Sequence, residues 1–365
     1  MYEEGKARIK YVDGAFLNPK AAISREISVA FVKSVAKGTS RVLDTTAATG
    51  IRGIRYCLED GIRDLTLLEI NANAYKALKR NLAFNGVKAA ALNKSVQEFA
   101  NTCDGNFDVI DLDPFGGVAP YIYDLMKISR DGTHLIATAT DTAVLCGANS
   151  KACMRIYGAR PMHNELCHEA GLRILIGYIV RMAAQFNFGI EVLMSVSRIH
   201  YMHVFLRLRH GSLKAMDSIS NMGYAYYCSR CCFRTHEKAF IATRRTCPEC
   251  NSELGAFGAM WLGSLYDRKT TRAVRAGLGS GAEKGAVALM DCIKGELDTP
   301  FYYDLPKLTQ NMHMSSVSPV KVREALERAG FESSPTHMDP DAIRTNADLG
   351  TVKRVIDSVM RANHI

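Results

Sequence analysis

Short apolar runs alternate with segments of helical periodicity along the first part of the chain. Runs of four or five apolar residues are typical of buried strands, whereas apolar residues at spacings of three and four are typical of helices. The predicted strands are 41–43, 65–68, 89–92, 109–112 and 135–139. The predicted helices between and before them are 23–35, 54–58, 72–84 and 121–128. Alternating strands and helices predict a parallel sheet with helices on both faces, which binds its ligands at the carboxyl ends of the strands.

The pattern changes in the second part of the chain. A long apolar helix is predicted at 172–184, followed by two strands at 189–196 and 202–208 that can complete the same sheet. Composition then shifts between 210 and 227, so we predict two domains, 1–215 and 216–365. A further helix with an apolar face is predicted at 319–330, and it can form a small helical RNA-binding unit with the tail.

The composition is that of a globular protein, with 47% hydrophobic and 23% charged residues among 365. No apolar run reaches the length that crosses a bilayer, and the first residues, MYEEGKARIK, lack the apolar core of a signal peptide. We therefore expect a soluble, cytoplasmic protein without a membrane partner. A net charge of +9 favours a polyanionic partner. Eleven cysteines in such a chain are better explained by reduced thiols and one metal site than by disulfides.

A glycine-containing turn follows the first predicted strand. It carries the A-x-G-x-x-G pattern, in which Ala48 replaces the first glycine of the dinucleotide fingerprint, and Gly50 and Gly53 follow. Glu69, at the end of the next strand, lies where an acid accepts hydrogen bonds from ribose hydroxyls. Both NAD and S-adenosylmethionine suit this layout, but Asp44 favours the second, because a carboxylate meets an ammonium group well and a pyrophosphate badly. A structural turn with Glu69 in solvent is the simpler alternative.

The segment Asp111-Leu112-Asp113-Pro114-Phe115-Gly116-Gly117 follows the fourth predicted strand. The carboxylate of Asp113 can accept a hydrogen bond from an exocyclic amine, and the ring of Phe115 can stack on a base. Pro114 fixes the turn that carries both side chains. A methyl donor at the end of the first strand, facing this segment, would make an amine methyltransferase. The alternative is an ordinary strand end with Asp113 in solvent.

Two C-x-x-C pairs, Cys228/Cys231 and Cys247/Cys250, give the strongest motif in the chain. This spacing brings four thiolates to one tetrahedral Zn²⁺, and four cysteine ligands make the site structural. A disulfide pair is the alternative. Basic residues that can contact nucleic-acid phosphates, or simply form a solvated face, lie between and beyond the pairs: Arg230, Arg234, His236, Lys238, Arg244, Arg245, Arg268, Lys269, Arg272 and Arg275.

A second candidate metal site is suggested by His163 and His168, which lie close in sequence to Glu165 and Glu169. Because an apolar helix follows directly, we interpret these histidines as packing or hydrogen-bonding residues.

With these motifs in place, the chain resembles the tRNA (guanine-26-N2)-dimethyltransferases in their archaeal form. The resemblance covers nearly the whole chain. It rests on the strings EGKARI, FLNPKAAISREISV, DTTAATGIRGIRY, DLDPFGG, TATDTAVLCG, YGARPMHNELCHEAGLRILIGYI, GIEVLMSVSRIHYMHVFLRL, MWLGSLYD and THMDPDAIRTNA. It implies a Rossmann-like class I S-adenosylmethionine-dependent methyltransferase sheet, with a smaller α+β C-terminal domain that carries the zinc ribbon.

The resemblance also assigns site residues. It implies that Arg25 and Arg52 bind the cofactor, that Glu69 holds the ribose, and that Ser95 and Val96 lie near the adenine. Ser95 departs from the acid that the family usually has there. Asp113 matches the catalytic acid, while Phe16 and Phe115 match a pair of rings that sandwich a flipped guanine. The alternatives are a solvated helix residue for Arg25 and an ion pair with a surface acid for Arg52. Without the family, Phe16 is better explained by core or loop packing than by a base clamp.

The expected activity is therefore mono- and dimethylation of the N2 amine of guanine 26 in tRNA, with S-adenosyl-L-methionine as cofactor and Zn²⁺ as a structural metal. We expect tRNA as the partner and a monomeric protein. Two alternatives remain: an N-methyltransferase for another RNA or DNA base, and a zinc-ribbon RNA-binding protein without catalysis.

Overall fold

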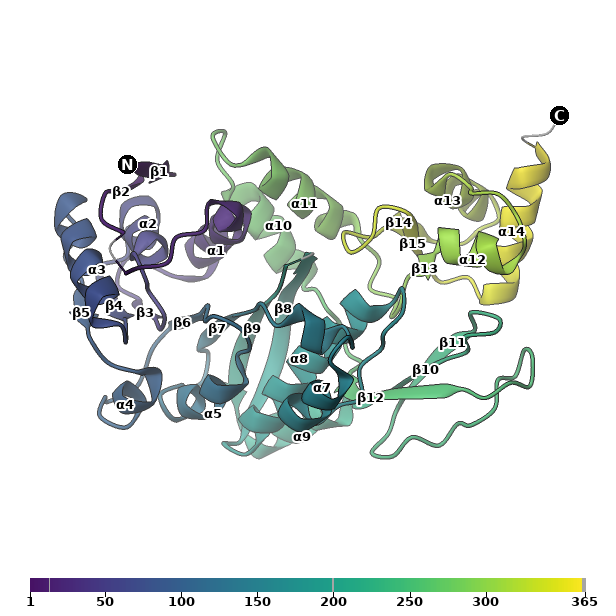
Figure 1. Ribbon diagram of the computed structural model, residues 1–365, viewed down its shortest axis with the longest axis horizontal. Helices are drawn as coiled ribbons and strands as arrows, with labels where there is room; N and C mark the ends of the chain where they lie inside the picture. The colour runs from purple at the N-terminus through teal and green to yellow at the C-terminus, as the bar shows by residue number, and fades with distance from the viewer. Residues whose placement is uncertain (13, 199, 363–365) are drawn as a thin grey trace.

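A seven-stranded sheet forms the centre of the computed structural model, which describes residues 1–12, 14–198 and 200–362 (Figure 1). Its strand order is β5-β4-β3-β6-β7-β9-β8. The first five strands in this order are parallel, whereas β9 runs antiparallel to β7, and β8 runs antiparallel to β9. The strands are β3 (Arg41–Asp44), β4 (Asp64–Leu68), β5 (Ala90–Leu92), β6 (Val109–Leu112), β7 (His134–Ala139), β8 (Phe188–Arg198) and β9 (Tyr201–His210).

Helices cover both faces of this sheet, as the alternating pattern predicts. One layer contains α1, which contacts α2, α10 and α11, and the other contains α5, α8 and α9, with α8 in contact with both of the others (Figure 1). None of the helices in the described part of the chain is long and apolar enough to cross a bilayer. The helices of the first part are α1 (Ala22–Val35), α2 (Ile51–Asp60), α3 (Ala72–Phe84), α4 (Val96–Ala100), α5 (Ala119–Lys127), α6 (Thr142–Leu145), α7 (Ser150–Tyr157), α8 (Cys167–Ala184) and α9 (Ser212–Ser220).

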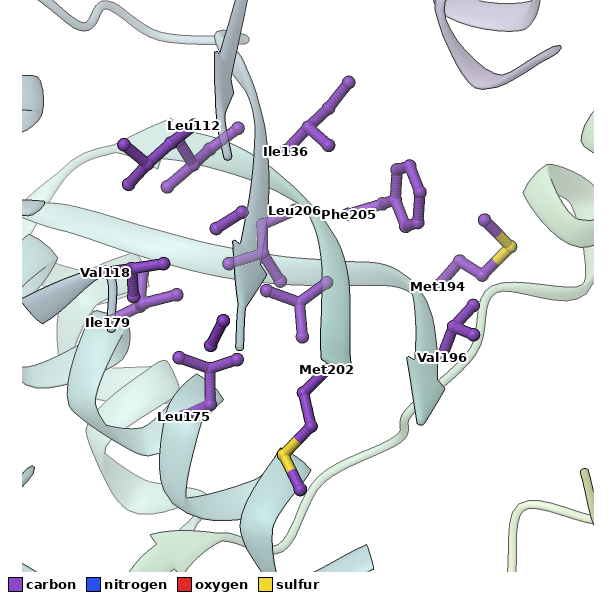
Figure 2. Packing of buried hydrophobic residues seen from close by; sticks show 14 of the residues in the cluster. Leu112, Val118, Ile136, Leu175, Ile179, Met194, Val196, Met202, Phe205 and Leu206 are labelled. Carbon is purple, nitrogen blue, oxygen red and sulfur yellow. The ribbon is translucent and has the colours of Figure 1, made fainter. Parts of the chain in front are cut away.

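The main core lies on both sides of the sheet. Phe205 packs on Phe31 of α1 with ring centroids 4.7 Å apart, while the next residue, Leu206, leaves the strand in a different direction (Figure 2). Successive side chains of a strand point to opposite faces, so β9 contributes to both layers. Leu175 and Ile179 of α8 belong to the same fully buried cluster. Burying each such side chain contributes about 1.5–3 kcal/mol to the free energy of folding. This contribution accounts for the continuous apolar character of these segments.

Helix α8 begins five residues before its predicted start. Its first turns carry Glu169 and Arg173, which interrupt the apolar pattern and yet are fully buried. Glu169 forms ion pairs with Arg173 and with Arg344, both at 2.8 Å, and Arg344 pairs with Glu296 at 2.6 Å. Because buried charges require such partners, a network assembled from distant segments explains why periodicity alone misses the first turn, which contains Glu169.

A second, smaller α+β region follows. Strands β10 (Met222–Tyr227), β11 (Arg234–Lys238) and β12 (Gly255–Trp261) form an antiparallel sheet. Helices α10 (Arg268–Gly277) and α11 (Lys284–Gly295) return to pack on α1. The final unit contains β13 (Tyr303–Asp304), α12 (Leu305–Asn311), α13 (Pro319–Arg328), β14 (Ser333–Pro335), β15 (Ala342–Thr345) and α14 (Leu349–Ala362).

This final unit has its own apolar cluster, which includes Val322 and Leu326 of α13 and Ile356 of α14. By contrast, the apolar residues of α10 and α11 belong to the main core. A small hairpin, β1 (Tyr2–Glu4) with β2 (Ala7–Ile9), and a short 3-10 helix, η1 (Pro19–Ala21), precede α1. The division of the chain at residue 215 stays a prediction.

Candidate active site

The strand order reverses between β3 and β6, and the carboxyl ends of these two strands are joined by hydrogen bonds. Thr45 donates to the carbonyl of Asp111 through its backbone N–H (3.0 Å) and through its hydroxyl (2.8 Å). The N–H of Asp113 donates to the hydroxyl of Thr46 at 3.2 Å. The glycine turn and the Asp113 segment are therefore held in one fixed arrangement at the place where a sheet of this topology binds its ligands.

The glycine turn adopts the backbone that its pattern predicts. Gly50 has a φ of 81° and precedes α2, and Ala48 has a φ of 48° at the position of the fingerprint's first glycine. A Cβ on Gly53 would lie 2.6 Å from the side chain of Leu67 in β4, so only glycine lets α2 pack this closely on the sheet. This turn leaves room for a ligand at the start of α2.

A cavity of about 430 Å³ opens beside this turn and is lined by Glu69, Ser95 and Val96. The carboxylate of Glu69 accepts hydrogen bonds from the N–H groups of Ala48 (2.9 Å) and Asn71 (2.7 Å), which hold it at the cavity wall. Ser95 is the N-cap of α4, where its hydroxyl accepts a hydrogen bond from the N–H of Glu98 and donates one to that residue's carboxylate. Its second lone pair can still accept from a ligand.

Asp44 is buried at the end of β3, and one of its carboxylate oxygens has no hydrogen-bond partner among the described residues. Burial, together with the nearby charge of Asp111, raises the pKa of Asp44 to about 7. A buried carboxylate oxygen without a partner costs free energy, which a ligand or ion that supplies the partner would recover. Asp44 lines a second cavity, of about 240 Å³, and a cationic group there would supply the missing partner.

Arg52, on α2, lies between two carboxylates of the β6 segment. Its guanidinium contacts Asp111 at 3.3 Å, forms an ion pair with Asp113, and donates to the hydroxyl of Ser28 at 2.8 Å. The hydroxyl of Tyr56 also donates to Asp111. Asp113 keeps about a third of its side chain exposed, whereas Arg52 is buried. The arginine therefore fixes the orientation of Asp113 while one side of the carboxylate faces the cavity.

Arg25, on α1, is also buried and lies at the base of the same site. It forms an ion pair with Glu4 at 2.5 Å and donates to the carbonyl of Asn18 at 3.1 Å through two nitrogens. The same Glu4 pairs with Arg55 of α2 at 3.0 Å. These contacts anchor the segment that carries Phe16 to the first hairpin and to α2.

Phe16 and Phe115 are in contact with each other across the mouth of the site. Their ring centroids are 4.4 Å apart with an interplanar angle of 61°, although 55% and 77% of the two residues are exposed. A flat base between two rings needs a separation of about 7 Å, that is, two contacts of about 3.5 Å. Below them lies a cavity of about 240 Å³, lined by Asp44, Asp113 and Pro114 among others. The pair must open by about 3 Å for a base to enter between the rings.

Sequence patterns did not identify the residues that hold this site together. Asp111 is the first residue of the predicted motif, but it holds Arg52 only because α2 packs beside the end of β6. Thr140, at the end of β7, accepts a hydrogen bond from the N–H of Gly116 and donates its own N–H to the carbonyl of Gly116, both at 2.9 Å. The only signal in the sequence is that Thr45 and Thr140 each follow a strand directly.

The model of the family described as N2,N2-dimethylguanosine tRNA methyltransferase matches residues 2–357. The chain belongs to this family. It is 34% identical to the tRNA (guanine(26)-N(2))-dimethyltransferase of Methanothermobacter thermautotrophicus over 94% of this chain and 93% of that protein. It is 35% identical to the protein of the same name from Thermococcus kodakarensis, over 98% of each chain.

A solved structure of the family agrees with the fold. Trm1 from Pyrococcus horikoshii, in complex with S-adenosyl-L-methionine, matches with a TM-score of 0.91 and 31% identity. The match covers 97% of this chain and 99% of that one. The predicted family and the predicted fold class, a Rossmann-like methyltransferase sheet with a smaller C-terminal α+β region, are confirmed.

Four cysteines of this chain form a cluster between β10 and β12. The Sγ atoms of Cys228 and Cys250 are 3.5 Å apart, as are those of Cys231 and Cys247, and all four lie within 4.8 Å of one another. Zinc–sulfur bonds of about 2.3 Å in a tetrahedron place sulfur atoms about 3.8 Å apart. The four thiols therefore fit the ion.

The basic residues predicted around the ribbon divide into two groups. Arg234 donates to the carbonyl of Phe301 and stacks on the ring of Tyr303, Arg268 donates to the carbonyl of Lys294, and Arg275 pairs with Asp291. The exposed members of the predicted set are Arg230, His236, Lys238, Arg244, Arg245, Lys269 and Arg272.

Proposed function

We propose that the protein is an S-adenosylmethionine-dependent methyltransferase that adds one and then a second methyl group to N2 of guanine 26 in tRNA. The proposal rests on one structural observation. In a chain of this family, an unpartnered buried carboxylate, Asp44, and a held carboxylate, Asp113, meet at the joined ends of β3 and β6. Family membership over residues 2–357 supplies the substrate class.

The cofactor would span the two cavities beside the glycine turn, which share Thr46 and Ala48 in their walls. Asp44 would hold the methionine ammonium group, since an ammonium ion gives its free oxygen a partner. Glu69 would accept hydrogen bonds from the ribose hydroxyls, and Ser95 and Val96 would lie at the adenine. N–H groups in the first turn of a helix lack partners within the helix, so the backbone of Val96 can donate to a ring nitrogen. When bound, the cofactor supplies an electrophilic methyl group.

Asp113 would orient the acceptor. The N2 amine of guanine is a weak nucleophile because its lone pair is delocalised into the ring. A carboxylate that accepts a hydrogen bond from this amine holds it in line with the methyl group and receives the proton that nitrogen loses when the N–C bond forms. Arg52 holds Asp113 in place, and Pro114 limits the movement of its backbone. After the first transfer, the remaining N–H can occupy the same position.

Phe16 and Phe115 would stack on the two faces of the flipped guanine. Each stacked ring contributes about 1–3 kcal/mol, which offsets the contact that the two rings lose as they separate. Arg25 supports this role indirectly, since it anchors the segment of Phe16 through Asn18.

The zinc ribbon would hold tRNA. A structural Zn²⁺ bound by Cys228, Cys231, Cys247 and Cys250 would fix the loops that present exposed basic side chains to phosphates. We expect the enzyme to act as a monomer in the cytoplasm.

Nucleoside analysis tests the proposal. The protein is incubated with a tRNA transcript and methyl-labelled S-adenosylmethionine, and the digested nucleosides are analysed by mass spectrometry. We expect labelled N2-methylguanosine early and N2,N2-dimethylguanosine late, and no label when adenine replaces guanine 26. Label on another base, or no label at all with intact cofactor binding, would refute the proposed substrate.

A further inference from the structure

A second group of metal ligands lies outside the ribbon and outside the cofactor site. Cys146 caps the end of α6, and Cys167 and His168 begin α8. One ligand atom from each of the three residues lies within 4.8 Å of the others. Among the described residues, this cluster and the ribbon are the two groups of this kind.

The spacing fits a tetrahedral ion. Cys146 Sγ lies 3.7 Å from His168 Nδ1. Bonds of about 2.3 Å to sulfur and about 2.05 Å to nitrogen place these two atoms about 3.6 Å apart in a tetrahedron. The three side chains are half-buried, so an ion can enter from solvent, and all three lie on helix ends with fixed backbones.

His163, Glu165 and Glu169 lie close to these residues in sequence, but each already has another hydrogen-bond or ion-pair partner. We therefore do not count them among the metal ligands. His163 Nδ1 lies 3.2 Å from the carbonyl of Cys146, and Glu165 accepts from the hydroxyl of Tyr227. Glu169 is held by the buried arginines described above. The sequence interpretation of His168 as a packing residue missed Cys146, which is more than twenty residues away and approaches only in the folded chain.

We propose that Cys146, Cys167 and His168 bind one Zn²⁺, with water as the fourth ligand. Two thiolates and an imidazole are the donor set that zinc prefers, and harder cations such as Mg²⁺ prefer oxygen ligands.

The position gives this ion a role in the catalytic domain. Helix α6 follows Thr140 and Asp141 directly, and Thr140 exchanges two hydrogen bonds with Gly116 in the Asp113 segment. Asp141 accepts a hydrogen bond from Tyr157 at 2.8 Å. An ion between Cys146 and α8 would therefore tie the loop that supports the Asp113 segment to α8, in which twelve of eighteen residues are buried. We infer a structural clamp, distinct from the zinc of the ribbon.

Metal analysis of three variants tests the assignment. The chain is purified under reducing conditions from cells supplied with zinc, and zinc per chain is measured by mass spectrometry. Relative to the native chain, the double variant Cys146→Ser/His168→Ala should contain about one zinc ion less per chain. The ribbon variant Cys231→Ser should also lose zinc, in this case from the ribbon. Cys103→Ser, a half-buried thiol outside both clusters, serves as the control and should lose none. Equal zinc in the native chain and the double variant would overturn the proposal.

A second measurement needs no variant and so does not depend on folding. X-ray absorption at the zinc edge of the native chain should show nitrogen or oxygen ligands at about 2.0–2.1 Å in addition to sulfur at about 2.3 Å. A sulfur-only shell would leave the ribbon as the sole site and would overturn the second one. Peptide mapping of the same protein, done without a reducing step, shows whether Cys146 and Cys167 have formed a disulfide. Such a disulfide would also exclude the ion, because neither cysteine would then be a thiolate.

Discussion

Asp44 offers the most direct test of how this site recognises a cofactor. Burial raises the pKa of its carboxyl to about 7, and one oxygen has no partner. The charged form should bind a ligand ammonium group, whereas the protonated form should not. Affinity for S-adenosylmethionine should therefore rise with pH below 7, while the ligand's own ammonium group, with an ordinary pKa of about 7.7–8.0, stays protonated.

The size of the effect follows from the ionised fraction. With a pKa of about 7, about half of the Asp44 carboxyls are charged at pH 7 and about 3% at pH 5.5. The dissociation constant should therefore increase about 16-fold between these pH values, which corresponds to about 1.6 kcal/mol. Asp44→Asn should remove most of this dependence and weaken binding at pH 7 by about 1.5–3 kcal/mol, the value of a hydrogen bond to a charged group.

Isothermal titration calorimetry of the ligand-free protein measures both effects. Glu69→Gln is the matched control: it should weaken binding at the ribose and leave the steepness of the pH profile unchanged.

The pH dependence of folding stability gives an independent check. Because the folded-state pKa of Asp44 lies above its unfolded value, its contribution to stability is complete below about pH 4 and is lost as pH rises through about 7. Asp44→Asn should thus stabilise the ligand-free protein at pH 8. A flat native profile would refute the reasoning.

Three other changes test the remaining parts of the structure. Asp113→Ala should slow single-turnover methyl transfer by about 10²–10⁴-fold with cofactor affinity retained in calorimetry; full activity would exclude its proposed role. Phe115→Ala should lower kcat/KM for tRNA by about 5- to 150-fold, the equivalent of about 1–3 kcal/mol of stacking, and an unchanged value would argue against the ring pair. Arg344→Met should reduce the free energy of unfolding by about 3–5 kcal/mol in urea titration, because Glu169 and Glu296 stay buried without their partner; a stable variant would show that the network is dispensable.

The sequence predicted the sheet well because its signals are local. The strand predicted at 109–112 and the helix predicted at 72–84 agree with β6 and α3 to the residue, since each is an apolar or periodic segment between clear breaks. The antiparallel direction of β9 did not follow from periodicity, because pairing direction depends on the connection and not on the strand.

The site was predicted in its parts but not in its contacts. Asp44, Gly50 and Asp113 stand beside strand ends, where chain order alone places them near one another. The arrangement of Arg52 between two carboxylates depends on how α2 packs, and the anchoring of Arg25 depends on the hairpin that supplies Glu4. Neither contact has a local pattern, so only the assembled fold defines it.

The hydrogen bonds between the ends of β3 and β6 have a consequence for motion. Thr45 and Thr46 join the two loops, so thermal fluctuations displace the methyl-donor side and the Asp113 side together. Their relative distance is then preserved even when the whole edge of the sheet shifts. Phe16, by contrast, lies on a segment that takes no part in these hydrogen bonds and is held through Arg25, Glu4 and α2. The alignment of the reacting groups and the entry of the base therefore depend on two different sets of contacts.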